Sequence, residues 1–242
     1  MALASGLQLA GGAEGNDPMA ASTTGIGELI DRALDLNAQR IVVGLGGSAT
    51  TDGGLGAIRA ITAPHRLRGV ELLVACDVTT RFTDAARVFG PQKGASPAQV
   101  ELLTRRLERL ADVYREQYGV EIIDLPGSGA AGGLAGGLAA LGGRLLPGFD
   151  LVADELELDE RIEGADLVIT AEGHLDAQSF AGKVVGGVAG IAAAHGVPCG
   201  VVCGIVDTDV AERLPRDHSS PITASNSPSA SHSCALRKAP QR

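Results

Sequence analysis

A run of aliphatic residues that ends in a glycine-rich loop occupies residues 41–56, IVVGLGGSATTDGGLG. Its β-branched residues predict a buried strand, and the residues after Gly54 are typical of the start of a helix. Glycines let backbone N–H groups approach a phosphate or a carboxylate, and the serine and threonine hydroxyls of the loop add further donors. The same pattern also fits a tight strand-to-helix turn in which Asp52 caps the helix. The spacing alone does not choose between an anion-binding loop and a turn.

Small residues dominate the composition and limit the kind of core that the chain can form. Of its 242 residues, 45% are hydrophobic but only 2% are aromatic, tryptophan is absent, and 34 are glycines. A core of Ala, Val, Leu, Ile and Gly fits a glycine-rich α/β protein with one large or two small domains. The formal net charge of −9 argues against a nucleic-acid partner, which requires a basic surface.

The cysteines and the uncharged stretches bear on the compartment in which the chain works. Cys76, Cys199 and Cys203 lie in apolar surroundings and no C-x-x-C pair occurs, so we expect buried, reduced thiols in a cytoplasmic protein. The N-terminus lacks the basic start and apolar core of a signal peptide. Residues 184–206 contain no Asp, Glu, Lys or Arg, but their glycines and a proline predict a helix, a turn and a strand rather than a membrane span.

Strand and helix patterns alternate along the chain and predict its fold class. The strongest helix signal lies at residues 97–118, which start with Ser96 as N-cap, proline at the first helical position and Gln99 completing a capping box. Strands are expected near residues 41–45, 72–75, 166–170 and 199–203, and further helices near residues 26–37, 55–61 and 184–195. This order predicts an α/β fold with a largely parallel sheet. Such sheets bind ligands at the carboxyl ends of their strands, which places residues 48–52, Asp77 and residues 172–176 at the edge of the expected site.

The remaining segments carry weaker signals. Residues 62–69 are expected to form a loop, and residues 79–95 to be irregular. The glycine- and alanine-rich residues 127–143 fit either a phosphate loop or a helix that packs closely on a sheet, and the second interpretation is favoured. After about residue 214 the chain becomes rich in serine and proline and loses its apolar period, so we expect a disordered tail.

Two familiar nucleotide-binding motifs are absent or only weakly matched, which limits the kinds of nucleotide site that the chain can contain. The P-loop pattern G-x-x-x-x-G-K-[ST] is absent, and the match of residues 44–49 to the dinucleotide fingerprint is weak because Glu71 precedes the second strand instead of ending it. What remains is a set of carboxylates and lysines on polar segments. Phosphoryl transfer uses such groups, since carboxylates hold Mg²⁺ or accept a proton and lysines offset phosphate charge. The members of this set are Asp52, Asp77, Lys93, Glu172, Asp176 and Lys183.

Five segments, in order, resemble conserved blocks of the bacterial type I glycerate kinases (glycerate 2-kinases). They are GLGGSATTDGG at 44–54, ACDVT at 75–79, FGPQKGAS at 89–96, PGSGAAGGL at 126–134 and ITAEGHLDAQS at 169–179. The resemblance extends over about residues 1–207. It implies transfer of the ATP γ-phosphate to D-glycerate with Mg²⁺. It also implies two α/β domains, one Rossmann-like and formed from both chain ends, the other inserted between them.

The same resemblance implies a set of site residues. We expect Asp176 to act as proton acceptor or Mg²⁺ ligand, Glu172 to be linked to the metal, and Lys183 to contact phosphate or carboxylate as a catalytic residue. The residues expected to bind substrate or phosphate are Gly46, Gly47, Ser48, Thr50, Asp52, Gly53, Asp77, Gln92, Lys93 and His174.

Departures from the family pattern lead to further expectations. The family's N-terminal segments have no counterpart, and the linker before Leu72 is short, so we expect a truncated chain with weak or no activity. The expected domains are a shortened inserted domain at 1–162, a partial Rossmann-like domain at 163–213 and the tail at 214–242. His174 replaces an arginine and should bind anions better as the pH falls toward 6. The alternatives are a non-catalytic remnant or small-anion-binding module and, more distantly, a dinucleotide oxidoreductase. The oligomeric state is left open.

Overall fold

The computed structural model describes residues 6, 8, 10–180, 184–207 and 222–225. The chain divides into two compact units, residues 1–151 and residues 152–242, and each is described below by itself. The boundary lies inside helix α6 (Gly148–Glu155). None of the helices in the described ranges combines the length and the apolar character needed to cross a membrane.

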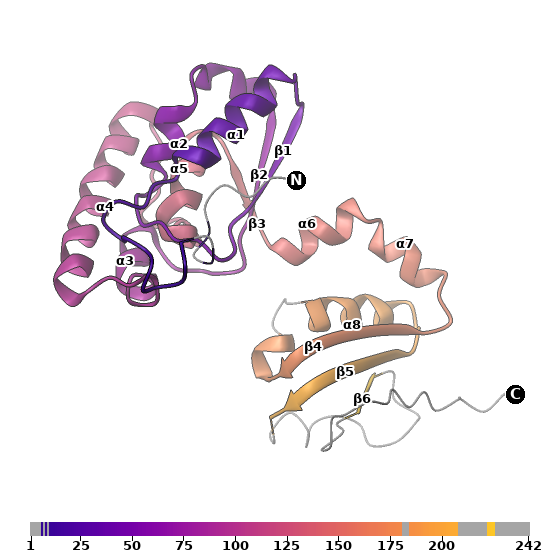
Figure 1. Cartoon of the computed structure of the whole chain (residues 1–242). Coiled ribbons are helices and arrows are strands. Elements are labelled where there is room, and N and C mark those ends of the chain that lie inside the picture. Colours follow the sequence, from indigo (N-terminus) through magenta and orange to yellow (C-terminus); the bar gives the residue numbers. More distant parts are fainter. Residues whose placement is uncertain (1–5, 7, 9, 181–183, 208–221, 226–242) are drawn as a thin grey trace, which may run out of the picture. The chain divides into compact units, whose positions relative to one another are not determined.

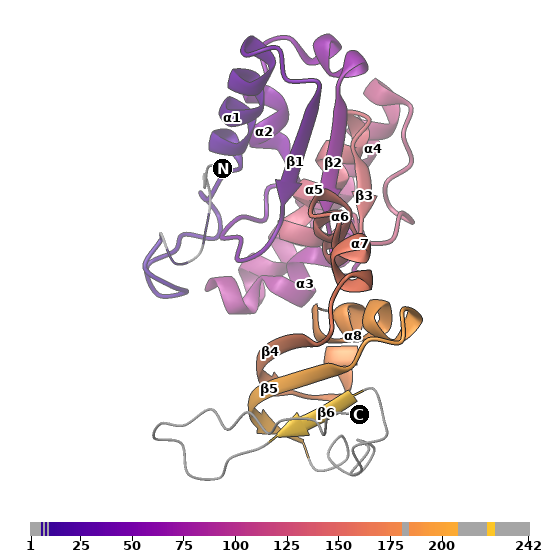
Figure 2. The same ribbon diagram turned by 90° about the vertical axis from the view of Figure 1, so that its right-hand side faces the viewer.

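Unit 1 is built on a parallel three-stranded sheet in the order β1-β2-β3. Its strands are β1 (Arg40–Gly44), β2 (Glu71–Ala75) and β3 (Arg144–Leu146). Its helices are α1 (Thr24–Asp35), α2 (Leu55–Ala60), α3 (Ala85–Phe89), α4 (Pro97–Tyr118) and α5 (Leu134–Ala140). Helices α1, α2, α4 and α5 lie to one side of the sheet (Figures 1 and 2). Strand β1 therefore buries Val43 in the core, whereas Val42 is 47% exposed.

The core of unit 1 is aliphatic, as the composition predicts. Ile30 and Leu34 of α1 pack with Leu72 and Val74 of β2 and with Leu138 of α5. A second cluster joins α4 to the segment before α3. This second cluster contains the aromatic rings of Phe82 and Tyr114, whose centres lie 6.1 Å apart.

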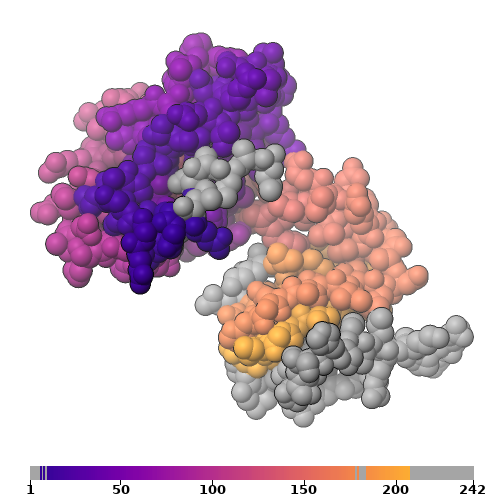
Figure 3. Space-filling model, in the orientation of Figure 1, coloured from indigo at the N-terminus to yellow at the C-terminus, as the bar shows by residue number. Residues whose placement is uncertain are grey.

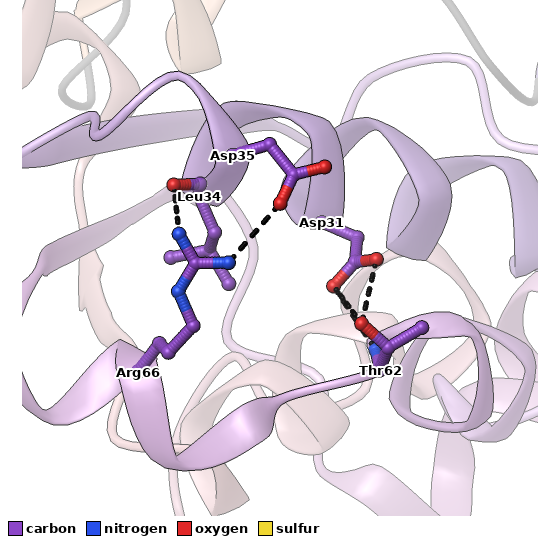
Figure 4. A network of polar contacts seen from close by, with 5 residues as sticks. All are labelled: Asp31, Leu34, Asp35, Thr62 and Arg66. Carbon is purple, nitrogen blue, oxygen red and sulfur yellow. Dashed lines mark hydrogen bonds and ion pairs between the residues drawn. The ribbon is translucent and has the colours of Figure 1, made fainter.

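The short linker between α2 and β2 is fixed to the end of α1. Predicted as a loop, it contains a 3-10 helix, η1 (Pro64–Gly69). The Arg66 guanidinium donates to the backbone carbonyl of Leu34 and to Asp35 Oδ1, the latter at 3.1 Å. The backbone N–H of Thr62 donates to Asp31 Oδ1 at 3.0 Å, and its hydroxyl donates to the same carboxylate (Figure 4). These contacts hold the C-terminal half of α1 against the linker.

The glycine-rich segment around α5 is a close-packing element, as the favoured interpretation predicts. All residues of α5 and of the preceding turn η4 (Ala130–Gly133) are buried. A β-carbon on Gly132 would lie 1.9 Å from the carbonyl oxygen of Thr50, and one on Gly136 would lie 2.4 Å from the ring of Phe82. Only glycine at these positions lets the segment approach the loop after β1.

Unit 2 contains a second parallel sheet, in the order β4-β5-β6. Its strands are β4 (Val168–Leu175), β5 (Cys199–Val206) and β6 (Ile222–Ser225), and its complete helices are α7 (Leu158–Glu163) and α8 (Val184–Ala194). Leu175, Val185 and Val201 form one small core between α8 and the strands. Ile169 and Val202 on these strands are 58% and 47% exposed.

The α/β class and the parallel pairing are confirmed, and several local predictions need correction. Helix α4 has the predicted bounds. Residues 79–95 are not irregular but form α3 and two 3-10 turns, η2 (Phe82–Asp84) and η3 (Pro91–Lys93). Strand β3 was not predicted. Residues 222–225, in the tail expected to be disordered, pair as β6 with β5, while the rest of the tail lies outside the described residues. Of the described cysteines only Cys199 is buried; Cys76 and Cys203 are half-buried.

Candidate functional site

The glycine-rich loop follows the carboxyl end of β1, where the parallel fold predicts a ligand site. Gly46 and Gly47 are exposed. A β-carbon built on either would meet no atom within 4 Å, and Gly47 has a left-handed backbone with φ of +68°. Ser48 is half-buried beside them. This outer part of the loop thus presents exposed backbone to a ligand.

The inner part of the loop is buried and held by Lys93. The Lys93 side chain is 2% exposed, and its ammonium donates to the carbonyl of Thr50 at 2.7 Å. The same ammonium lies 5.8 Å from the centre of the Phe89 ring. Burial lowers the pKa of Lys93 to about 8, partly offset by the negative charge of Asp52. This geometry favours an anchoring role for Lys93 over the predicted contact with phosphate.

Asn16 is a second anchor, and sequence reasoning missed it. Its side-chain amide donates to the carbonyl of Ala49 at 3.0 Å and to the carbonyl of Lys93 at 2.8 Å. Two successive carbonyls of the loop, those of Ala49 and Thr50, are therefore held by neighbouring side chains. The only sequence signal at Asn16 is that of a turn before Pro18, which does not indicate a partner 33 residues away.

Asp52 joins the starts of two helices. Its Oδ2 accepts from the backbone N–H and hydroxyl of Thr23, at 2.9 and 2.8 Å, and from the N–H of Gly56 at 3.1 Å. Its Oδ1 accepts from the N–H of Gly54 at 3.2 Å. Asp52 thus binds backbone N–H groups at the strand-to-helix turn, although the N-cap residue of α2 is Gly54 and not Asp52.

Gly53, next to Asp52, is fixed from two sides. Its carbonyl accepts from the Tyr114 hydroxyl at 2.9 Å, and its N–H donates to the carbonyl of Gly132 at 3.0 Å. Burial raises the pKa of Tyr114, and the nearby Asp52 charge adds to this effect. The hydroxyl of Thr51, in the same buried stretch, has no hydrogen-bond partner among the described residues.

Two other predicted residues of unit 1 lie apart from this hydrogen-bonded group. Asp77 follows β2 and is exposed, and its Oδ1 accepts from the backbone N–H of Gly148, the first residue of α6, at 2.7 Å. Gln92 is exposed on η3. The structure thus joins Lys93 to Thr50 by a direct hydrogen bond, and Asp52 and Gly53 follow in the same loop.

A cavity of about 340 Å³ lies beside Asp52, also within unit 1. It lies between the segment that leads into α1 and helix α2. Its lining residues are Met19, Ala20, Ala21, Ser22, Thr24, Asp52, Leu55, Gly56, Arg59 and Ala60. Of these, only Asp52 was predicted as a site residue.

The predicted residues of unit 2 lie on β4 and just after it. Strand β4 continues to Leu175, so Glu172 and His174 belong to the strand, which was expected to end near residue 170. His174 Nε2 lies 2.7 Å from Oδ1 of Asp207, which follows β5. This hydrogen bond raises the pKa of His174, with the charges of Asp207, Asp176 and Glu172 acting in the same direction. The pKa of His174 therefore lies above the ordinary value of an imidazole, and Asp207 is a further residue that the sequence did not indicate.

The two carboxylates predicted to bind Mg²⁺ differ in their surroundings. Oδ1 of Asp176 accepts from the backbone N–H and the hydroxyl of Ser179, at 2.9 and 3.1 Å. Oε2 of Glu172 is buried and has no hydrogen-bond partner among the described residues. Within those residues no group of three or more His, Cys, Asp or Glu side chains is placed to hold a metal ion. Lys183, the third predicted catalytic residue, lies outside them.

Comparison with known proteins places these features in a family context. The family model of the glycerate kinase family matches residues 1–65 and 61–242. Glycerate 2-kinase from Escherichia coli (strain K12) is 41% identical over 224 residues, which cover 79% of this chain and 58% of that protein. Glycerate kinase from Bacillus subtilis (strain 168) is 37% identical over 227 residues, which cover 81% of this chain and 59% of that protein.

A solved structure supports the same relationship. The crystal structure of a protein assigned as glycerate kinase 2, from Salmonella typhimurium LT2, matches with a TM-score of 0.74 and 38% identity. The match covers 83% of this chain and 62% of that one. The chain therefore spans about 60% of the length of the relatives that it matches.

Proposed function

The chain belongs to the glycerate kinase family, and on this premise we propose that it transfers the γ-phosphoryl group of ATP to a hydroxyl of D-glycerate. The observation that carries the proposal is the glycine-rich loop after β1. Its outer glycines are exposed and its inner residues are anchored by Lys93 and Asn16. Phosphoryl transfer depends mainly on positioning and electrostatics, so a loop fixed from behind and open in front suits the reaction.

Within this proposal, backbone N–H groups and the Ser48 hydroxyl at the outer part of the loop bind an anionic group of a substrate. Lys93 and Asp52 hold the loop in shape. A loop that is already ordered loses little conformational entropy when the ligand binds, which favours binding.

The carboxylates of unit 2 fit the Mg²⁺ ion that such a reaction uses. Mg²⁺ is commonly held by one or two carboxylates together with phosphate oxygens and water, so a larger cluster of protein ligands is not required. Glu172 and Asp176 are the residues that would hold it, and the buried Oε2 of Glu172 has an unused acceptor position. When bound, the ion would offset charge on the transferring phosphoryl group.

Asp176 is proposed, alternatively, to accept the proton of the attacking hydroxyl. Ser179 donates two hydrogen bonds to Oδ1 of Asp176 and thereby restrains the orientation of the carboxylate. An oriented carboxylate within reach of the substrate hydroxyl would act as general base.

A coupled assay of ADP formation tests the proposal with the full chain, ATP, MgCl₂ and D-glycerate. Glycerate-dependent ADP release is expected, and Asp176→Asn should lower kcat by about 10²-fold or more. Asp166→Asn, the same chemical change at an exposed position of unit 2, is the control and should leave the rate unchanged. Equal rates for the wild type and Asp176→Asn would remove Asp176 from catalysis. Binding of D-glycerate without ADP release would favour the small-anion-binding alternative.

A further inference from the structure

The cavity beside Asp52 has lining groups that no part of the site described above uses. The N-terminal part of unit 1, in indigo, is exposed at the surface (Figure 3). Residues of segment 19–24 form one wall of the cavity, and residues of α2 form the other. Met19, Ala20, Ala21, Leu55 and Ala60 supply the apolar part of these walls, called the apolar floor below. A β-carbon on Gly56 would lie 2.3 Å from Ser22 Oγ, so glycine is needed there for α2 to approach the segment.

The polar groups of the cavity have unused hydrogen-bonding capacity. Arg59 is exposed on α2 and makes no hydrogen bond or ion pair with any residue in the described part of the chain. The hydroxyls of Ser22 and Thr24 lie 2.7 Å apart, so one O–H donates to the other oxygen and the second O–H remains available. The carboxylate of Asp52 is already engaged by the described residues, since Oδ2 accepts from Thr23 and Gly56 and Oδ1 accepts from Gly54.

This set of groups selects a class of ligand. A guanidinium pairs with a carboxylate through two parallel hydrogen bonds, and a hydroxyl such as that of Ser22 or Thr24 can donate a hydrogen bond to a ligand hydroxyl. A volume of 340 Å³ lies near the lower end of the range for ligand pockets and suits a small molecule better than a nucleotide. The apolar floor can contact a short carbon chain.

We propose that this cavity binds a small hydroxy-carboxylate, with Arg59 on its carboxylate and the available hydroxyl of the Ser22–Thr24 pair on one of its own hydroxyls. The inference rests on the proposed function in one respect, because D-glycerate belongs to this class of molecule. It goes further by assigning the acid-binding site to the cavity and by making Arg59 a residue that determines specificity.

The test is isothermal titration calorimetry of the full chain with D-glycerate, and with glycerol as a ligand that lacks the carboxylate. D-Glycerate should bind and glycerol should not. Arg59→Gln should weaken D-glycerate binding by about tenfold or more, and Arg59→Lys should retain part of the affinity. Arg105→Gln, which removes the same charge from an exposed position on α4, is the control and should bind like the wild type.

A second variant tests the cavity itself. Ala21→Leu adds volume to the lining without removing a polar group, and it should weaken D-glycerate binding while leaving the thermal midpoint within a few degrees of the wild type. Equal affinity of the wild type and Arg59→Gln, or no binding of D-glycerate to the wild type, would overturn the assignment.

The outcome is distinguishable from that of the proposed kinase activity. Arg59-dependent binding of D-glycerate without ADP formation would support the cavity assignment and contradict the kinase proposal. Glycerate-dependent ADP formation with an unchanged KM for D-glycerate in Arg59→Gln would support the kinase and overturn the cavity assignment.

Discussion

Replacement of Lys93 by methionine should change the dependence of stability on pH in a way that the structure specifies. The Lys93 ammonium is buried and donates to the carbonyl of Thr50. Its pKa is about 8 in the folded chain, against an ordinary value of 10.5. Methionine has a similar length and no charge, so it fills the same space and removes both the titration and the hydrogen bond.

The sign follows from proton binding. Between pH 8 and 10.5 the unfolded chain holds a proton on Lys93 that the folded chain has released, so wild-type stability rises with pH in this window. The full effect is about 3 kcal/mol, at ~1.36 kcal/mol per pKa unit. Between pH 7 and 9.5 the contribution of Lys93 amounts to about 2 kcal/mol.

In Lys93→Met the free energy of unfolding does not rise with pH through this group. The variant also leaves the Thr50 carbonyl without its buried donor, which lowers the free energy of unfolding by about 1–3 kcal/mol. At pH 7 this loss is offset by the removal of a buried charge, and the two proteins should have similar stability. The free energy of unfolding of the wild type minus that of Lys93→Met should therefore be about 2 kcal/mol larger at pH 9.5 than at pH 7.

Urea unfolding followed by tyrosine fluorescence measures this difference. The chain has two tyrosines and no tryptophan, and both tyrosines, Tyr114 and Tyr118, lie on α4 in unit 1, so the signal reports the unit that contains Lys93. Comparing variant and wild type at each pH cancels other titrating groups. A stability difference that is the same at pH 7 and pH 9.5 would refute the buried position of the ammonium.

Further predictions concern single contacts. Tyr114→Phe should lower the free energy of unfolding by about 1–3 kcal/mol, because the buried carbonyl of Gly53 loses its donor; urea unfolding measures it, and an unchanged midpoint would contradict the contact. Asn16→Ala should speed amide hydrogen exchange at residues 49–53, since the carbonyl of Ala49 loses its anchor; equal exchange rates in the variant and the wild type would contradict the anchoring role of Asn16. Asp207→Asn should lower the pKa of His174, because the carboxylate that favours the imidazolium is gone; an NMR titration that gives the same pKa for both proteins would refute the pairing.

Local signals predicted part of this structure well. Helix α4 begins where predicted because Ser96, Pro97 and Gln99 are adjacent in sequence and form the capping box by themselves. The strand before the glycine loop was found for a similar reason, since its aliphatic run and the following glycines are contiguous.

The features that the sequence did not predict depend on contacts between residues that are distant along the chain. Lys93 reaches a carbonyl 43 residues away, and no local pattern shows that its charge is buried. The expected strand near residues 166–170 stopped short of the polar residues Glu172 and His174, but parallel pairing with β5 continues the strand through them to Leu175. The partner of His174 is 33 residues away, at Asp207. Burial and pairing of this kind depend on the folded chain, so the contacts of these side chains could be identified only from the structure.

The most direct test of the proposed phosphorylation of D-glycerate is ³¹P NMR of the full chain with ATP, MgCl₂ and D-glycerate. The proposed activity predicts a new phosphomonoester resonance that grows with ADP and does not form when D-glycerate is replaced by glycerol. Spectra that show only unreacted ATP, or ADP with inorganic phosphate, would contradict it.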